Sequence, residues 1–167
     1  MNDAYMDPFL SHAMQVWKKE LGCPLNFCGS EDVTHEITTE DVTAFIRISG
    51  HIEGHILYGF NKDTASAIVG KILGLEVEDI TEVALSALGE LANMITVNAV
   101  SDLAAAGQTC QMSSIVFADH IGTKITNLNT TQRRAVFISQ LGFLHMRVGL
   151  VERPRGEDMG WLLNRLG

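Results

Sequence analysis

The chain has 167 residues, of which 46% are hydrophobic and 19% are charged, a length and composition that fit one globular domain. Its formal net charge of -8 would repel a phosphate backbone, and no stripe of Lys and Arg offsets it, which argues against nucleic acid as a partner. The first residues carry acids where a secretory signal would carry Lys or Arg, and no run of about eighteen apolar residues is present. We therefore expect a cytoplasmic protein without a membrane partner.

The cysteines and histidines do not predict a metal site. Cys23, Cys28 and Cys110 lack a paired zinc spacing, so we expect three reduced thiols. His51 and His55 are the best-spaced pair among six histidines, but they flank an expected turn, and the spacing indicates no third ligand. We interpret them as polar surface residues and expect this chain to bind no metal and no cofactor.

The N-terminal part predicts one helix. Apolar residues recur at helical spacing over residues 8–21, with Pro8 expected in the first turn. Gly22 stands just past the last of them, where a helix commonly ends. A polar loop containing Pro24 and Gly29 is expected next.

A β-hairpin and two helices are expected in the middle of the chain. Apolar and polar residues alternate over 41–49, glycines bound a turn at 50–54, and residues 55–60 form the returning strand. The second helix, which Asp63 or Thr64 can cap, ends before Gly74; the third and longest opens with Asp79 as its cap and runs to about Ala106.

Three further strands complete the expected domain, over residues 111–118, 134–140 and 144–151. The predicted fold is α+β, a largely antiparallel sheet with helices packed on it. We expect one domain over residues 1–151, followed by a C-terminal tail over 152–167.

The third helix carries a polar stripe. At about 100° per residue, Glu90 lies about 40° and Asn93 about -20° from Ser86, so the three side chains share one direction. The apolar residues of this helix fall in the opposite arc, the face that the sheet would bury. They are Leu88, Leu91, Ala92, Ile95, Ala99 and Leu103.

Glu90 and Asn93 are three residues apart, so their side chains would be neighbours on the surface and able to hold one small target. An asparagine amide cannot act as a base at neutral pH, but it can orient a water molecule. On geometry alone, such a pair usually marks only a solvated helix face. We read Asn98, which lies off this stripe, as structural.

The run Ser86-Ala87-Leu88-Gly89-Glu90-Leu91-Ala92-Asn93, followed by Asn98-Ala99, resembles the signature helix of the CheC/CheX/FliY chemotaxis phosphatase family. The family motif is Asp or Ser, three residues, Glu, two residues, Asn. The opening helix around Asp7-Pro8-Phe9-Leu10 and the hairpin around Gly50 and Gly54 resemble the family as well. CheX members are the nearest likeness, because the first helix here has no second Glu-x-x-Asn pair. Where the family motif places a proline, this sequence has Val116.

The resemblance implies hydrolysis of an aspartyl phosphate on a CheY-like response regulator. Glu90 and Asn93 would be the catalytic residues: Asn93 would orient the attacking water, and Glu90 would dock the regulator's lysine. Ser86 would support the motif, and the Mg²⁺ ion would belong to the regulator. The resemblance also implies a homodimer, for which the expected strand 134–140 would offer an edge. The alternative is a non-catalytic module that binds a regulator or a component of the motor switch.

Overall fold

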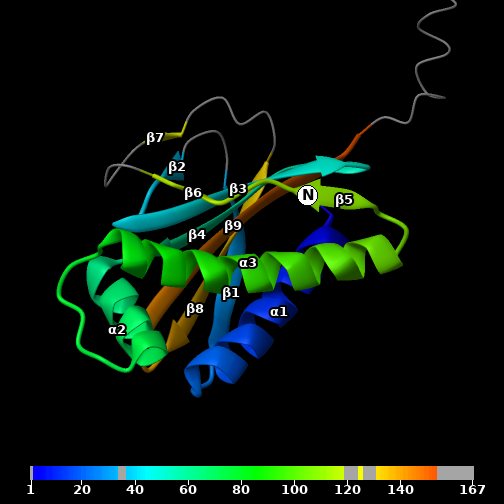
Figure 1. Cartoon of the computed structure of the whole chain (residues 1–167). Coiled ribbons are helices and arrows are strands. Elements are labelled where there is room, and N and C mark those ends of the chain that lie inside the picture. Colours follow the sequence, from blue (N-terminus) through cyan, green and yellow to red (C-terminus); the bar gives the residue numbers. More distant parts are fainter. Residues whose placement is uncertain (1, 34–36, 119–123, 126–130, 154–167) are drawn as a thin grey trace, which may run out of the picture.

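Three helices cover one face of an antiparallel sheet in the computed structural model, which describes residues 2–33, 37–118, 124–125 and 131–153 (Figure 1). A two-stranded ribbon, β2 and β7, lies on the other side of the sheet. The helices are α1 (Asp3–Leu21), α2 (Lys62–Leu73) and α3 (Glu82–Ala105). The strands are β1 (Asn26–Val33), β2 (Ile37–Thr38), β3 (Val42–Gly50), β4 (Ile52–Phe60), β5 (Cys110–Met112), β6 (Val116–Phe117), β7 (Lys124–Ile125), β8 (Gln132–Ser139) and β9 (Gly142–Glu152).

The main sheet has seven strands in the order β1-β8-β9-β4-β3-β5, with β6 also paired to β3. Neighbouring strands run antiparallel. The expected α+β fold is therefore confirmed. Strand β9 runs one residue past the expected end of the domain at 151, and residues 154–167 of the expected tail lie outside the described residues.

Helix α1 begins earlier than the sequence predicts. Asn2 caps it by accepting a hydrogen bond from the Ala4 backbone N–H, so Pro8 lies inside the helix and its placement in the first turn was wrong. Proline withholds one N–H from the carbonyl four residues earlier, here that of Ala4. Ala4 is exposed, so water can hydrate that carbonyl. The helix ends at Gly22 in the left-handed conformation, as expected.

The other two helices also have caps that differ from the prediction. Asn61 caps α2 by accepting from the Thr64 N–H at 2.8 Å, and Thr81 caps α3 by accepting from the Ala84 N–H at 3.3 Å. The predicted caps, Asp63 or Thr64 and Asp79, were wrong. Both helix starts offer more than one Asn, Asp or Thr side chain within four residues, and any of these types can cap, so local sequence leaves the start open.

Strand β1 is the longest of three strands that the sequence did not predict, the other two being β2 and β7. It pairs with β8, yet its residues are exposed or half-buried, so it shows no buried alternation. Ion pairs join the two strands: the Arg133 Nε lies 3.0 Å from an Asp32 carboxylate oxygen, and the Arg134 Nη1 lies 3.1 Å from Glu31. Because β1 covers it, β8 is an inner strand, and the expectation that residues 134–140 form an edge was wrong.

The hairpin of β3 and β4 forms as expected, but its turn is shorter than 50–54. Strand β3 ends at Gly50 and β4 begins at Ile52, so Gly54 lies within β4, opposite Leu150 of β9. The expected strand 111–118 is two short strands, β5 and β6, which both pair with β3.

Helix α3 runs across the sheet and supplies much of the core (Figure 1). By length and composition alone it is apolar enough to cross a membrane, a test that core helices of folded domains also pass. The six apolar residues predicted to face the sheet are all buried, so the predicted orientation of the helix is confirmed. They are Leu88, Leu91, Ala92, Ile95, Ala99 and Leu103.

Gly54 provides a stability test. Its φ is 148°, and a methyl group there would collide with the Gly149 carbonyl oxygen on β9. We expect Gly54→Ala to lower the free energy of unfolding by more than about 4 kcal/mol, measured by urea denaturation. Gly29→Ala is the control, because its φ is also positive, 132°, but nothing lies within 4 Å of the added methyl group. That variant should lose about 1 to 2 kcal/mol from backbone strain alone; equal losses would contradict the collision.

Candidate functional site

The predicted polar stripe of α3 lies on its outer surface. Ser86 and Glu90 are exposed, and Asn93 is half-buried. Within the described part of the chain, none of these three side chains takes part in a hydrogen bond or an ion pair. The carboxylate of Glu90 and the amide of Asn93 are therefore available to a group that approaches from outside.

Exposed apolar side chains extend the stripe in both directions. Val83 and Val97 stand seven residues before and after Glu90, and a heptad shifts direction on a helix by only about 20°. Their exposed fractions are 64% and 47%. The two valines were not among the residues predicted for this face, which were all polar. Their heptad spacing from Glu90 was the available signal.

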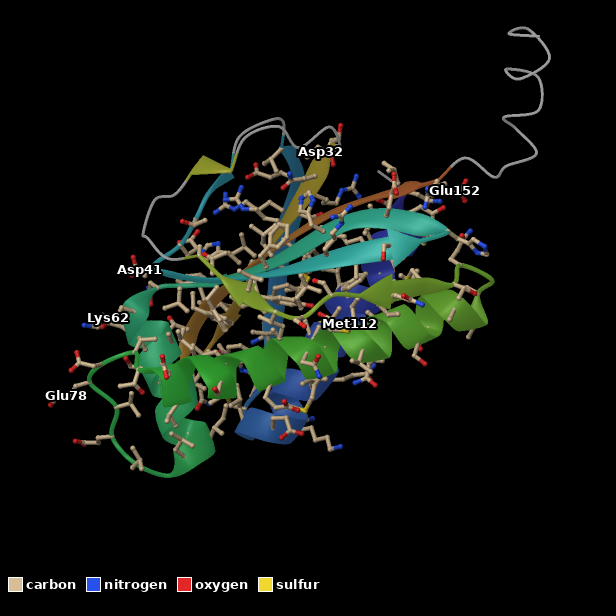
Figure 2. All side chains as sticks on the ribbon, turned by 45° about the horizontal axis from the view of Figure 1, so that its top comes forward. Asp32, Asp41, Lys62, Glu78, Met112 and Glu152 are labelled. Carbon is tan, nitrogen blue, oxygen red and sulfur yellow. The ribbon has the colours of Figure 1, made fainter. Side chains whose placement is uncertain are left out.

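Strand β6 runs beside the stripe. Gly89 is buried, and a methyl group built on it would lie 3.5 Å from the Phe117 ring and 3.7 Å from Ile115. Val116, between these two residues, is 61% exposed. Unlike the proline of the family motif, Val116 keeps a backbone N–H. Strand β5 precedes β6 in the chain and also packs against α3. Its last residue, Met112, is labelled in Figure 2.

A buried polar contact joins α3 to the sheet at Thr96, three residues after Asn93. The Tyr58 hydroxyl on β4 lies 2.8 Å from the Thr96 hydroxyl, and both side chains are fully buried. The Thr96 hydroxyl in turn donates to the Ala92 carbonyl at 2.8 Å. Burial raises the pKa of Tyr58 well above its ordinary value, so the phenol keeps its proton. This pair could not be predicted from the sequence, since neither residue type stands out in an apolar strand or helix.

Asn98 and the two histidines considered as metal ligands lie away from the polar stripe or make contacts of their own. The Asn98 amide donates to the Met94 carbonyl at 2.8 Å, a bond within its own helix that fits the structural reading. His51 is exposed in the hairpin turn, whereas His55 is buried and stacks on Phe45 with ring centres 5.7 Å apart. Reading His55 as a surface residue was therefore wrong. Burial lowers its pKa, which favours the neutral ring.

Charged residues also gather on the sheet face that the helices leave open. Arg134 contacts Glu31 and lies 3.3 Å from the His145 ring nitrogen. Burial is the first cause that lowers the pKa values of His145 and Arg147. Within the described ranges, neither this group nor any other brings together three His, Cys, Asp or Glu side chains that could hold a metal ion.

Comparison with known proteins gives the site its context. The sequence profile of the family described as chemotaxis phosphatase CheX matches residues 42–138, more than half of the chain. The chain belongs to this family. The matched range contains the whole polar stripe and strand β6, including Ser86, Glu90, Asn93 and Val116.

A curated relative, the CheY-P phosphatase CheX of Thermotoga maritima, is 40% identical over 63 residues, which cover 37% of this chain and 41% of the relative. The alignment thus spans less than half of that protein. Among solved structures, a CheC-like superfamily protein from a Shewanella species has a TM-score of 0.82 at 23% identity, over 90% of this chain and 99% of the other. The CheX-CheY-BeF3-Mg²⁺ complex of Borrelia burgdorferi gives 0.77 at 21%, over 89% and 98%. These two structures share the fold.

Proposed function

We propose that this protein is a phosphatase that hydrolyses the aspartyl phosphate of a CheY-like response regulator. The observation that carries the proposal is the motif on α3: an exposed Glu90 without a partner in the described residues beside a half-buried Asn93, inside the range that matches the CheX family. The names of two relatives support the same partner. One is a CheY-P phosphatase, and the other was solved as a complex with CheY.

Asn93 orients the attacking water in this mechanism. The water oxygen forms a bond to phosphorus, the bond from phosphorus to the regulator's aspartate oxygen breaks, and the water proton leaves with the phosphate product. The regulator supplies the Mg²⁺ ion and a lysine, which offset the charge of the phosphoryl group. A correctly placed water is then the main element still missing, and holding it in line lowers the entropic part of the barrier.

Glu90 has a different role, because a carboxylate is repelled by the phosphoryl oxygens. Its charge suits the ammonium group of the regulator's lysine, with which it forms a charge-assisted hydrogen bond. Glu90 therefore docks and aligns the regulator. Ser86 completes the motif one helical turn earlier, where we assign it a supporting role. Val83 and Val97 flank Glu90 on the same face and supply apolar contact area for the same partner.

A second candidate is a non-catalytic module that binds a regulator or motor-switch component without turnover. The observation that favours it is Val116, which replaces the family proline on the strand beside the motif. Hydrolysis of a phosphorylated receiver separates the two functions, because a module that only binds would leave the rate of phosphate loss unchanged.

Cytoplasmic location and a homodimer complete the proposal. Within the described residues, β1 forms one edge of the main sheet, and β5 with β6 forms the other. Pairing through β1 leaves α3 open, since α3 packs beside β5 at the opposite edge. Phe27 on β1 is 44% exposed and offers apolar area for a second copy.

Asn93→Ala should reduce kcat about 100-fold and leave receiver affinity nearly intact, because a contact to the attacking water is made mainly in the transition state. Loss of phosphate from a labelled receiver gives the rate. Asn98→Ala is the matched control, since it removes the same side chain from an exposed position of the same helix. Wild-type turnover by Asn93→Ala would refute the mechanism.

Glu90→Ala should weaken receiver binding as well as turnover, because its contact with the lysine already exists in the bound ground state. Affinity is measured by titration with the phosphorylated receiver. Glu53→Ala, which removes an exposed carboxylate from β4, should retain both properties. The Asn93 and Glu90 variants should keep a free energy of unfolding within about 0.5 kcal/mol of wild type. A large drop in melting temperature would contradict the exposed placement of the stripe.

Turnover should require Mg²⁺ even though we assign no metal site to this chain. The ion neutralises charge on the phosphoryl group while bound to the regulator. Calorimetry should detect Mg²⁺ binding to the receiver and no tight binding to the free phosphatase. A stoichiometric tight site on this chain would overturn the assignment of the ion to the regulator.

Light scattering at micromolar concentration should give the mass of a dimer, and Phe27→Asp should shift it to that of a monomer by placing a charge on the β1 edge. Leu75→Asp is the control, because Leu75 is 57% exposed in the loop before α3. It should remain dimeric. A wild-type chain that scatters as a monomer would refute the dimer.

A further inference from the structure

A chain of two hydrogen bonds runs from the sheet to the backbone of α3, and its proton directions follow from the donors available. The Thr96 hydroxyl has one proton, which it donates to the Ala92 carbonyl at 2.8 Å. It can then only accept from Tyr58, whose hydroxyl lies 2.8 Å away. The order is therefore Tyr58 O–H to Thr96 O–H to Ala92 C=O.

This series of hydrogen bonds ends at the peptide unit that joins Ala92 to Asn93. The carbonyl of Ala92 and the backbone nitrogen of Asn93 belong to one planar group, so a bond that holds the carbonyl also holds the start of Asn93. Thr96 lies three residues after Asn93, so the two side chains are neighbours on the helix. The two buried hydrogen bonds thus meet the helix at the peptide before Asn93 and one helical turn after it.

A contribution to stability is a weak explanation for these two hydrogen bonds. Tyr58 and Thr96 are fully buried in an otherwise apolar core, which includes Ile56, Phe60 and Ile95. A buried hydrogen bond between neutral groups adds little net stability, whereas removing one partner leaves the other unsatisfied. Replacing both partners with apolar groups of similar shape can be nearly neutral. What hydrogen bonds add here is geometry, because they restrict distance and direction more than apolar contacts do.

We propose that Tyr58 and Thr96 are positioning residues for the phosphatase reaction: their hydrogen bonds set the rotation of α3 and hold Asn93 where it can orient the attacking water. The inference rests on the proposed function. Neither residue touches the substrate. Each acts through the Ala92–Asn93 peptide, so their loss lowers kcat and leaves the Glu90-dependent affinity for the receiver unchanged.

The double variant Tyr58→Phe/Thr96→Val separates positioning from stability. It removes both hydroxyls, so no buried polar side chain of the pair is orphaned, and its melting temperature should stay near that of wild type. Its kcat should fall about 10- to 100-fold, as expected when a reacting group is misplaced by a fraction of an ångström to about 1 Å. A role in stability alone would give the opposite result: little loss of kcat in a folded protein.

Two single variants supply the controls. Thr96→Ser keeps the hydroxyl, so its kcat should stay near the wild-type value. Val148→Ala removes buried carbons from β9 and leaves both hydroxyls in place, so it should lower the melting temperature and keep kcat at a temperature where it is folded. If the double variant turns over at the wild-type rate, the positioning role is refuted.

The test also distinguishes this inference from the proposed function. The substrate is the receiver domain of the host that the wild-type protein dephosphorylates, found by screening phosphorylated receivers. If wild type dephosphorylates none of them, the proposed function fails, and crystal structures of wild type and the double variant decide whether the two hydroxyls position Asn93. A shift of the Asn93 amide relative to β4 supports that role, and an unmoved amide refutes it.

Discussion

The structure depends on how α3 divides its surface between the sheet and solvent. One arc, from Leu88 to Leu103, is fully withdrawn from water, and burying apolar area of this kind is the main favourable term in folding. The opposite arc faces outward, with Ser86 and Glu90 exposed and Asn93 half-buried. The position of Ser86, Glu90 and Asn93 is thus a consequence of core packing, and no loop has to hold them in place.

Small side chains let the helix lie close to its neighbours. Gly89 has no side chain, so the Phe117 ring and Ile115 approach the backbone next to Glu90, and the small side chains of Ala92 and Ala99 are buried on the inner side of the helix. Such packing is dense, and a larger side chain would force its neighbours to move. Tight packing beneath an exposed carboxylate and a half-buried amide is what a site needs if its function is to orient water and a partner.

The sequence predicted the features that depend on a repeating apolar pattern. It did not predict those that depend on a single contact between particular residues. The apolar period of α3 was enough to predict its orientation and the exposed face. The helix starts were mispredicted because Asn61 and Thr81 stand among other residues that can cap equally well. Strand β1 has no buried alternation, so only its pairing with β8 reveals it. Tyr58 and Thr96 lie 38 positions apart in the sequence, and no local pattern predicts the hydrogen bond between their hydroxyls.

The way β1 is attached makes it sensitive to ionic strength. Its acids, Glu31 and Asp32, face Arg134 and Arg133 across the strand pair, and these acidic side chains are largely exposed. The Debye length falls from about 10 Å at 0.1 M salt to about 3 Å at 1 M, the length of these contacts, so molar salt weakens the ion pairs but affects the buried contacts of β3, β4 and β9 little. The tilted contact between the Phe27 and Phe137 rings, whose centres lie 5.5 Å apart, does not depend on charge. The outer strand should therefore fray first as salt rises, while α3 and the sheet beneath it stay folded.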